Sequence, residues 1–123
     1  MEALLIEATE DSPKIALDAA NNLFQISGRS LPENAIGFYQ PVFDWLQNYL
    51  QSPNTESVFE FQLEYFNTAS AKQIAKILLF LEKLSIKSDV IVKWYYKQDD
   101  VDMLASGQRY AKLINVKFEV LEN

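Results

Sequence analysis

The clearest pattern in the chain is a strict alternation of apolar and polar side chains along residues 56–66. The apolar set is Phe59, Phe61, Leu63 and Tyr65, and the polar set is Glu60, Gln62 and Glu64. Successive side chains of a β-strand point to opposite faces of the sheet. The alternation therefore predicts a strand with one buried face, which includes Tyr65, and one solvated face.

Five shorter strands are predicted from consecutive or alternating apolar residues at residues 3–8, 14–19, 23–27, 89–96 and 116–120. Asn21 and Asn22 stand between the second and third of the chain's strands, and asparagine can take the positive φ that a tight turn needs. The pattern therefore predicts a hairpin near the N-terminus.

Apolar residues recur every three or four positions in three other segments, which is the spacing of one helix face. The first predicted helix covers residues 41–51, because Pro41 suits the first turn of a helix. A loose turn at residues 35–40 precedes it. The second predicted helix covers residues 69–84.

The third predicted helix follows Asp99 or Asp100, either of which can cap it, and ends where Asn115 can adopt the left-handed conformation. The order of elements is then β-β-β-α-β-α-β-α-β, which is typical of the α/β class. We expect a single domain over residues 1–123: a mixed, largely parallel sheet with an N-terminal hairpin and about three helices packed on it. In broad outline this architecture is similar to the STAS-type domains of bacterial anti-sigma-factor antagonists. Those domains carry a phosphorylatable serine or threonine where a helix follows a central strand.

The composition makes several partners and compartments poor candidates. The chain has 17 Asp and Glu against 11 Lys and Arg, a net charge of −6, so nucleic acid is not expected as a partner. Four lysines are spaced along the second predicted helix, a pattern typical of a solvated helix face rather than an anion site; they are Lys72, Lys76, Lys83 and Lys87. No apolar run is long enough to span a bilayer and no signal peptide is recognisable, so we expect a cytoplasmic protein without membrane insertion.

Histidine and cysteine are absent, which removes most common catalytic and zinc chemistry. No glycine-rich nucleotide motif is present. We therefore expect no catalytic residue, no cofactor and no metal site. Two alternatives stay open: a pair of carboxylates acting in a small-ligand enzyme, and a hard-cation site at Asp99, Asp100 and Asp102. For that cluster, an acid-rich helix N-terminus is the commoner explanation.

The junction at residues 67–70, Asn-Thr-Ala-Ser, supports two interpretations. Asn, Thr and Ser all cap helices, because a side-chain oxygen accepts a bond from a free backbone N–H group. The same N–H groups and the helix dipole favour a bound anion, so a hydroxyl here is also a candidate phosphate acceptor. Thr68 is the better candidate, because it lies nearer the strand end; Ser70 is the alternate.

Motifs along most of the chain resemble those of the SiaC family, small bacterial regulatory phosphoproteins. The matching segments are residues 26–34, 38–41, 45–46, 49, 63–72, 94–96, 99–100 and 103–107. The family often has a further hydroxyl residue where this chain has Ala69, which narrows the acceptor to Thr68 or Ser70.

The resemblance implies a non-enzymatic switch protein. It implies phosphorylation of Thr68 by a cognate Ser/Thr protein kinase and dephosphorylation by a PP2C-type phosphatase. It also implies that the unmodified form binds an output protein, a diguanylate cyclase, in cyclic-di-GMP and biofilm signalling. The expected docking surface comprises Asn67, Thr68, Ser70, Lys72, Arg29 and Glu33. The alternatives are the carboxylate-dependent enzyme and a purely structural subunit.

Overall fold

A computed structural model describes all 123 residues, and its element order is the predicted one. The strands are β1 (Leu4–Ile6), β2 (Lys14–Asp18), β3 (Leu23–Ser30), β4 (Glu56–Phe66), β5 (Asp89–Tyr96) and β6 (Lys117–Glu122). The helices are α1 (Ala35–Gln51), α2 (Thr68–Leu84) and α3 (Val101–Leu113). None of the three helices combines the length and apolar character needed to cross a membrane.

The six strands form one sheet in sequence order, β1-β2-β3-β4-β5-β6. The pairs β1–β2 and β2–β3 are antiparallel, and β3 through β6 are parallel. This confirms the mixed, largely parallel sheet with an N-terminal hairpin. In the hairpin turn it is Asn22 that takes a positive φ, of 53°, whereas Asn21 bonds through its side chain to Asp18.

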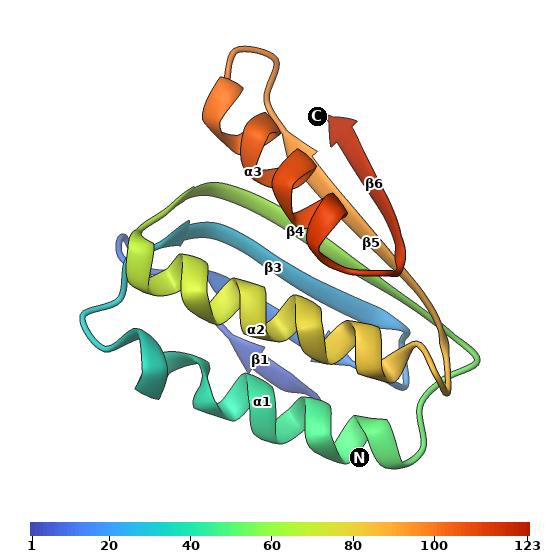
Figure 1. The fold of residues 1–123 in the computed structure, drawn as a ribbon. Coiled ribbons are helices and arrows are strands. Elements are labelled where there is room, and N and C mark those ends of the chain that lie inside the picture. Colours follow the sequence, from blue (N-terminus) through green and yellow to red (C-terminus); the bar gives the residue numbers. More distant parts are fainter.

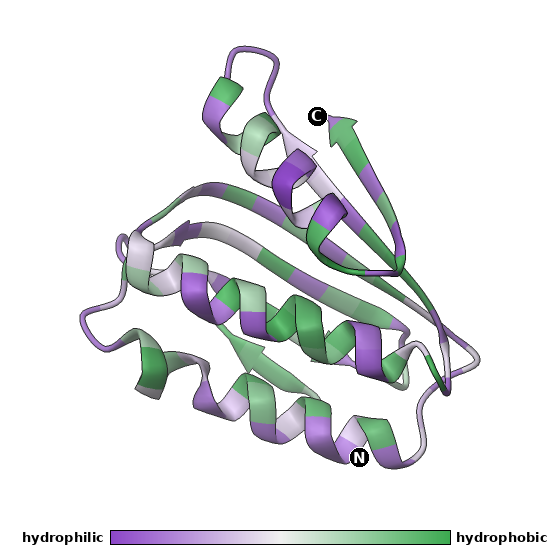
Figure 2. Cartoon of the chain, in the orientation of Figure 1, coloured by the Kyte–Doolittle hydropathy of each residue, from purple (hydrophilic) through white to green (hydrophobic).

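All three helices lie on one face of the sheet, as Figure 1 shows, so the molecule has two layers. In Figure 2, hydrophobic and hydrophilic residues recur in turn along the ribbons of α1 and α2, as in amphipathic helices. A single cluster of 23 buried hydrophobic residues fills the space between the layers. Trp94 belongs to this cluster and is fully buried, with its ring stacked on that of Phe61 at a centroid distance of 5.5 Å.

Helix α1 begins earlier than predicted. Residues 35–40 are its first turns rather than a separate loose turn, and Pro41 lies inside the helix. Asn34 caps it, its side-chain oxygen accepting a bond from the Gly37 N–H at 3.1 Å. Pro41 cannot donate to the carbonyl four residues earlier, and Figure 1 shows a bend between the first turns and the rest of the helix.

Strand β4 contains a bulge that the alternating pattern did not reveal. Gly28 pairs with Leu63, but the next residue, Arg29, pairs with Tyr65, so Glu64 is an extra residue on β4. A bulge reverses the alternation of side chains beyond it. Tyr65, predicted to be buried, is therefore 46% exposed, and Phe66 turns inward onto Trp94 instead.

Helix α3 is capped by Asp100, whose side chain accepts a bond from the Met103 N–H at 2.9 Å. The prediction that Asn115 ends the helix in the left-handed conformation is wrong, because Asn22 is the chain's one non-glycine residue with positive φ. The helix ends instead at Ile114, which has extended backbone angles and a buried side chain.

Candidate functional site

The start of α2 lies at the end of the sheet formed by the carboxyl ends of the parallel strands. The Asn67 N–H donates to the Ser30 carbonyl at 3.0 Å, which fixes the chain between β4 and α2 beside the end of β3. The Asn67 side-chain oxygen accepts a bond from the Ser70 N–H at 2.9 Å, and its carbonyl accepts one from the Ala71 N–H. Asn67, and not Thr68, is therefore the cap of this helix.

Thr68 is the first residue of α2, and its side chain is exposed. Its hydroxyl makes no hydrogen bond within the chain, because Asn67 already supplies the capping oxygen. The N–H groups of Thr68 and Ala69 precede the first intrahelical bond, so they have no helical acceptor. A free hydroxyl and two free N–H donors thus meet at the positive end of the helix dipole.

Ser70 has the opposite surroundings. Its side chain is fully buried and accepts a bond from the Ser30 hydroxyl at 2.8 Å. Ser30 in turn bonds the Tyr39 hydroxyl at 2.6 Å, so three buried hydroxyls join β3, α1 and α2. Burial raises the pKa of Tyr39 to about 12, and the Ser30 hydrogen bond lowers it only in part. The Ser70 hydroxyl is therefore closed to solvent in the folded chain.

Arg29 is exposed and ties three segments together near this site. Its guanidinium carbon lies 5.6 Å from the centre of the Tyr65 ring, and its Nε donates to the Glu10 carbonyl at 3.3 Å. A cation over an aromatic face is attracted to it. Arg29 therefore holds the outward-turned Tyr65 against the segment between β1 and β2.

Glu33 is exposed in the loop between β3 and α1, one residue before the cap of α1. Because β3 and β4 are parallel, this loop and the start of α2 lie at the same edge of the sheet, as Figure 1 shows. The expected docking residues are thus brought to one end of the molecule. Ser70 lies there too, but its side chain is buried.

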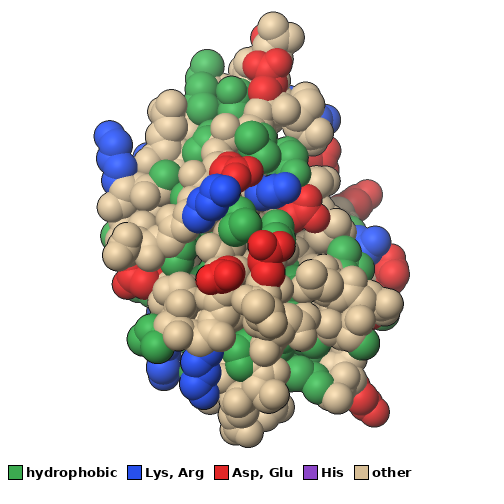
Figure 3. Space-filling view, turned by 90° about the vertical axis from the view of Figure 1, so that its right-hand side faces the viewer, with side chains coloured by type: hydrophobic (Ala, Val, Ile, Leu, Met, Phe, Trp, Pro, Cys, Tyr) green, Lys and Arg blue, Asp and Glu red, His purple; other side chains and the backbone are tan.

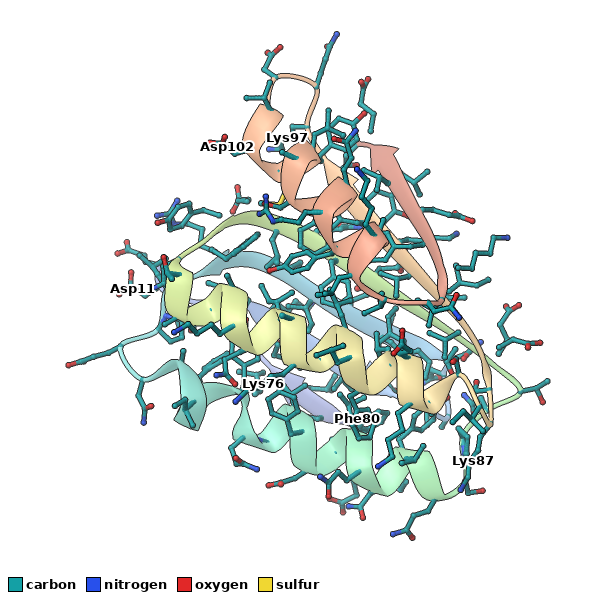
Figure 4. All side chains as sticks on the ribbon, in the orientation of Figure 1. Asp11, Lys76, Phe80, Lys87, Lys97 and Asp102 are labelled. Carbon is teal, nitrogen blue, oxygen red and sulfur yellow. The ribbon has the colours of Figure 1, made fainter.

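Lys72 is exposed one turn after Thr68, and all four lysines of residues 72–87 are exposed. None of them forms an ion pair, since the chain has one ion pair, between Lys117 and Glu119. Lys87 follows the end of α2, where Figure 4 labels it, and its ammonium donates to the Leu50 carbonyl. Lys72, Lys76 and Lys83 therefore form a solvated face of α2, and Lys72 alone is near Thr68.

Two parts of this surface were missed by the sequence interpretation. Tyr65 was assigned to the core, and only the bulge turns it outward. Asp11 lies between two of the predicted strands and was given no role, yet the Asp11 carbonyl accepts a bond from the Leu31 N–H at 2.8 Å. Figure 4 places Asp11 beside the start of α2. Nothing in the local sequence indicates that this segment joins the surface.

An open cleft of about 390 Å³ lies beside Tyr65, between the end of β4 and the start of α3. Glu64, Asp100 and Asp102 line it, with Phe66, Met103 and Ser106. No group of three or more acidic side chains in the chain is arranged to hold a metal ion. Asp100 caps α3, which accounts for one member of the acidic cluster as a helix N-terminus.

Comparison with known proteins agrees with this architecture. Residues 6–123 match the model of the SiaC family regulatory phosphoproteins. An uncharacterized protein of Pseudomonas aeruginosa (strain UCBPP-PA14) is 30% identical over 97 residues, which are 78% of this chain and 77% of that protein.

Solved structures share the whole fold. The structure of SiaC of Pseudomonas aeruginosa superposes with a TM-score of 0.88 at 24% identity, over 100% of both chains. A chain in the crystal structure of the diguanylate cyclase SiaD in complex with its activator SiaC, from the same species, gives 0.90 at 24% identity, over 98% of this chain and 99% of that one. The family match covers nearly the whole sequence, and the chain therefore belongs to the SiaC family of regulatory phosphoproteins.

Proposed function

We propose that the chain is a phosphorylation-controlled docking protein without catalytic activity of its own, with Thr68 as the phosphate acceptor. The observation that carries the proposal is the contrast between the exposed, unbonded Thr68 hydroxyl and the sealed Ser70 hydroxyl two residues later. The folded chain offers an enzyme one hydroxyl at this junction.

The physical chemistry of the helix start supports a phosphate there. A phosphoryl group adds a charge of about −1.5 to −2 and three acceptor oxygens. Free N–H groups and the helix dipole stabilise such a group at a helix N-terminus. Because Asn67 and not Thr68 caps α2, the modification breaks no capping bond. Phosphorylation therefore leaves the fold intact and changes the charge and shape of the surface.

The output partner we propose is a diguanylate cyclase, because the similar SiaC of the solved complex activates the cyclase SiaD. The docking surface comprises Asn67, Thr68, Lys72, Arg29 and Glu33, together with Tyr65. Unmodified, this surface binds the cyclase. The added charge and bulk on Thr68 oppose that contact. A cognate Ser/Thr kinase and a PP2C-type phosphatase set the two states, and the protein acts in the cytoplasm.

The assignment of the acceptor is tested by peptide mapping of the protein purified from its native cells. We expect a single phosphate on the peptide that contains Thr68 and none on Ser70. Treatment with a PP2C-type phosphatase removes it. A phosphate found only on another residue contradicts the proposal.

The docking role is tested with substitutions that leave the fold intact. Thr68→Asp should weaken binding to the cyclase, and Thr68→Ala should bind like the unmodified protein. Thr55→Asp is the matched control. Thr55 is exposed and immediately precedes β4, at the end of that strand opposite Thr68, so this substitution should not affect binding. Equal binding by all three variants contradicts a docking surface at Thr68.

A further inference from the structure

The sheet has two edges, and they differ in length. β1 has three residues, whereas β6 has six and pairs only with β5. In Figure 1, β6 is the outermost strand on its side, and no other element lies beyond its edge. Such a strand presents a row of unpaired backbone N–H and C=O groups, to which another strand can bond.

The unpaired groups of β6 can be assigned from one hydrogen bond. The Asn123 N–H donates to the Tyr96 carbonyl. In a parallel pair, the bonded groups belong to every second residue of a strand. The odd-numbered residues therefore bond β5, and the groups that point outward belong to Phe118, Val120 and Glu122.

The side chains of β6 divide between the two faces of the sheet. Phe118 and Val120 lie on the helix side against the core, and the Phe118 ring is 6.4 Å from that of Trp94. Lys117 and Glu119 lie on the other face and form an ion pair at 3.6 Å. Figure 3 looks onto this side of the molecule and shows basic and acidic side chains close together among hydrophobic ones. Charged residues on an edge strand often prevent it from pairing with another chain. The order of the charges along β6 therefore decides which strand can pair with it.

We propose that β6 pairs with β6 of a second copy of the chain, antiparallel and about a two-fold axis normal to the sheet. Opposing residues must then share a face, so the axis lies midway between one residue and its own copy, and that residue is the centre of the pairing. A centre at Glu119 sets Glu119 against itself, which like charges disfavour. A centre at Val120 sets Glu119 against Leu121 and leaves the charges without partners.

A centre at Phe118 fits the charges. It sets Lys117 opposite Glu119 of the second copy, and the two-fold axis repeats that pair. It also sets Phe118 opposite Phe118 of the second copy. The backbone N–H and C=O groups of Phe118 point outward, so the two residues can bond each other. Opposite charges and aromatic pairs stabilise directly opposed positions. The order of charges along β6 thus selects this register.

The neighbouring helix is compatible with the same pairing. Helix α3 contacts both β5 and β6 on the helix side of the sheet. Joining two edges at the strand spacing of about 4.8 Å places α3 and its copy roughly 10 Å apart, a normal helix packing distance. The flank of α3 turned away from the cleft carries Leu104 and Ala111, which are half-buried and uncharged. No like charges on this flank oppose the approach.

The interface is small, so the association is weak and depends on concentration. It is independent of the proposed switch, because Thr68 follows β4, two strands in from the joined edge. Each copy keeps its docking surface free.

Sedimentation velocity over a range of concentrations tests the pairing. The unmodified chain should pass from monomer to dimer as concentration rises. Lys117→Glu and Glu119→Lys should each weaken the dimer at least tenfold, and the double variant should restore it, because the opposed pairs are re-formed with reversed signs. Lys76→Glu, on the exposed face of α2, is the matched control and should have no effect.

A second measurement does not depend on charge. Amide hydrogen exchange of Phe118 and Val120 should slow at high concentration, whereas the Glu119 amide, bonded to β5, should not change. Val120→Pro should abolish the dimer and leave the monomer folded, because it removes an N–H that faces outward. A chain that stays monomeric at high concentration, or a dimer that the charge reversals leave unchanged, overturns the proposal.

Discussion

At the scale of single residues, two hydroxyls two positions apart have opposite surroundings. The side chain of Thr68 is exposed and makes no hydrogen bond, whereas that of Ser70 is part of a buried network with Ser30 and Tyr39. The local sequence allows both residues as caps and ranks Thr68 first as the acceptor only because it lies nearer the strand end. The difference arises from Asn67, which takes the capping role, and from the helix, whose third residue faces the core.

The cap can be tested through stability. Asn67→Ala removes the oxygen that accepts the Ser70 N–H bond, so we expect the free energy of unfolding to fall by about 1 kcal/mol. Asn48→Ala is the control: Asn48 is exposed within α1, and its replacement should change stability by less than about 0.5 kcal/mol. Urea unfolding of both variants measures the difference. Equal stabilities of the two variants would show that Asn67 is not the cap.

Tyr39 makes stability depend on pH at the alkaline end. Its pKa is raised to about 12 in the folded chain, against about 10 for an exposed tyrosine. Between these values the unfolded chain loses the proton that the folded chain keeps. The contribution of Tyr39 to the free energy of unfolding is therefore fully present below about pH 10 and is lost as the pH rises toward about 12. Two pKa units correspond to at most about 3 kcal/mol.

Urea unfolding from about pH 8 to pH 12 should show this decline. Tyr39→Phe should make the decline shallower, and it should also lower stability by about 1 kcal/mol at neutral pH, because Ser30 loses a hydrogen-bond partner. Parallel declines in the two proteins would contradict a buried, neutral Tyr39.

At the scale of elements, patterns of period two and 3.6 predict where strands and helices lie but not how they meet. The alternation in residues 56–66 predicted both ends of β4, and it was wrong about Tyr65 because an inserted Glu64 leaves no mark on the period. The first turns of α1 were missed because Pro41 suggests a helix start. Yet Ala35, Tyr39 and Val42 continue the helical spacing and are buried.

In the candidate site, too, the local sequence predicts which residues share an element but not which elements meet. Asn67, Thr68 and Lys72 are neighbours along one helix, so the local sequence places them together. The stack of Arg29 on Tyr65 joins two strands, and the bond from Leu31 to Asp11 joins two loops. Such contacts depend on strand register, which a single sequence without a partner strand does not specify.

The outward turn of Tyr65 predicts a role in docking. Exposed aromatic side chains often supply a large share of binding energy at protein interfaces. Tyr65→Ala should change the free energy of unfolding by less than about 1 kcal/mol, because the side chain is 46% exposed, and should weaken binding to the cyclase at least tenfold. Leu113→Ala, at an exposed apolar residue at the end of α3, is the control and should bind normally. Calorimetric titration compares them, and unimpaired binding of Tyr65→Ala would exclude this residue from the surface.

The packing of α3 on the sheet depends on a glycine. A Cβ at Gly107 would overlap the indole of Trp94, which is buried and donates a bond to the Met103 carbonyl at 3.0 Å. Replacing glycine by alanine inside a helix normally stabilises it by roughly 1 kcal/mol. We expect the opposite sign here, a loss of about 2 kcal/mol or more in the free energy of unfolding, because the core must shift.

Thermal or urea unfolding of Gly107→Ala measures this loss. Ala105→Gly, at an exposed position of the same helix, gives the ordinary propensity effect, about 1 kcal/mol of destabilisation. A stabilised Gly107→Ala variant would show that α3 does not approach Trp94 closely.

At the scale of the whole molecule, the fold places the candidate docking surface at the end of the sheet where the parallel strands finish, beside the buried core. Parallel β3, β4 and β5 bring the segments that follow them to the same edge of the sheet. Three of the elements near that edge are joined by the Ser30, Tyr39 and Ser70 hydroxyls. The surface around Thr68 is therefore held by the core, and we expect a change of charge on it to act on a partner and not on the fold.

The central claim is that a phosphate on Thr68 opposes docking while the protein stays folded. The most direct measurement is calorimetric titration of the cyclase with the chain phosphorylated stoichiometrically at Thr68, beside the unmodified chain, with circular dichroism of both. We predict superimposable spectra and at least a tenfold loss of affinity, about 1.4 kcal/mol or more. Equal affinities, or a loss of affinity that accompanies unfolding, would contradict the account.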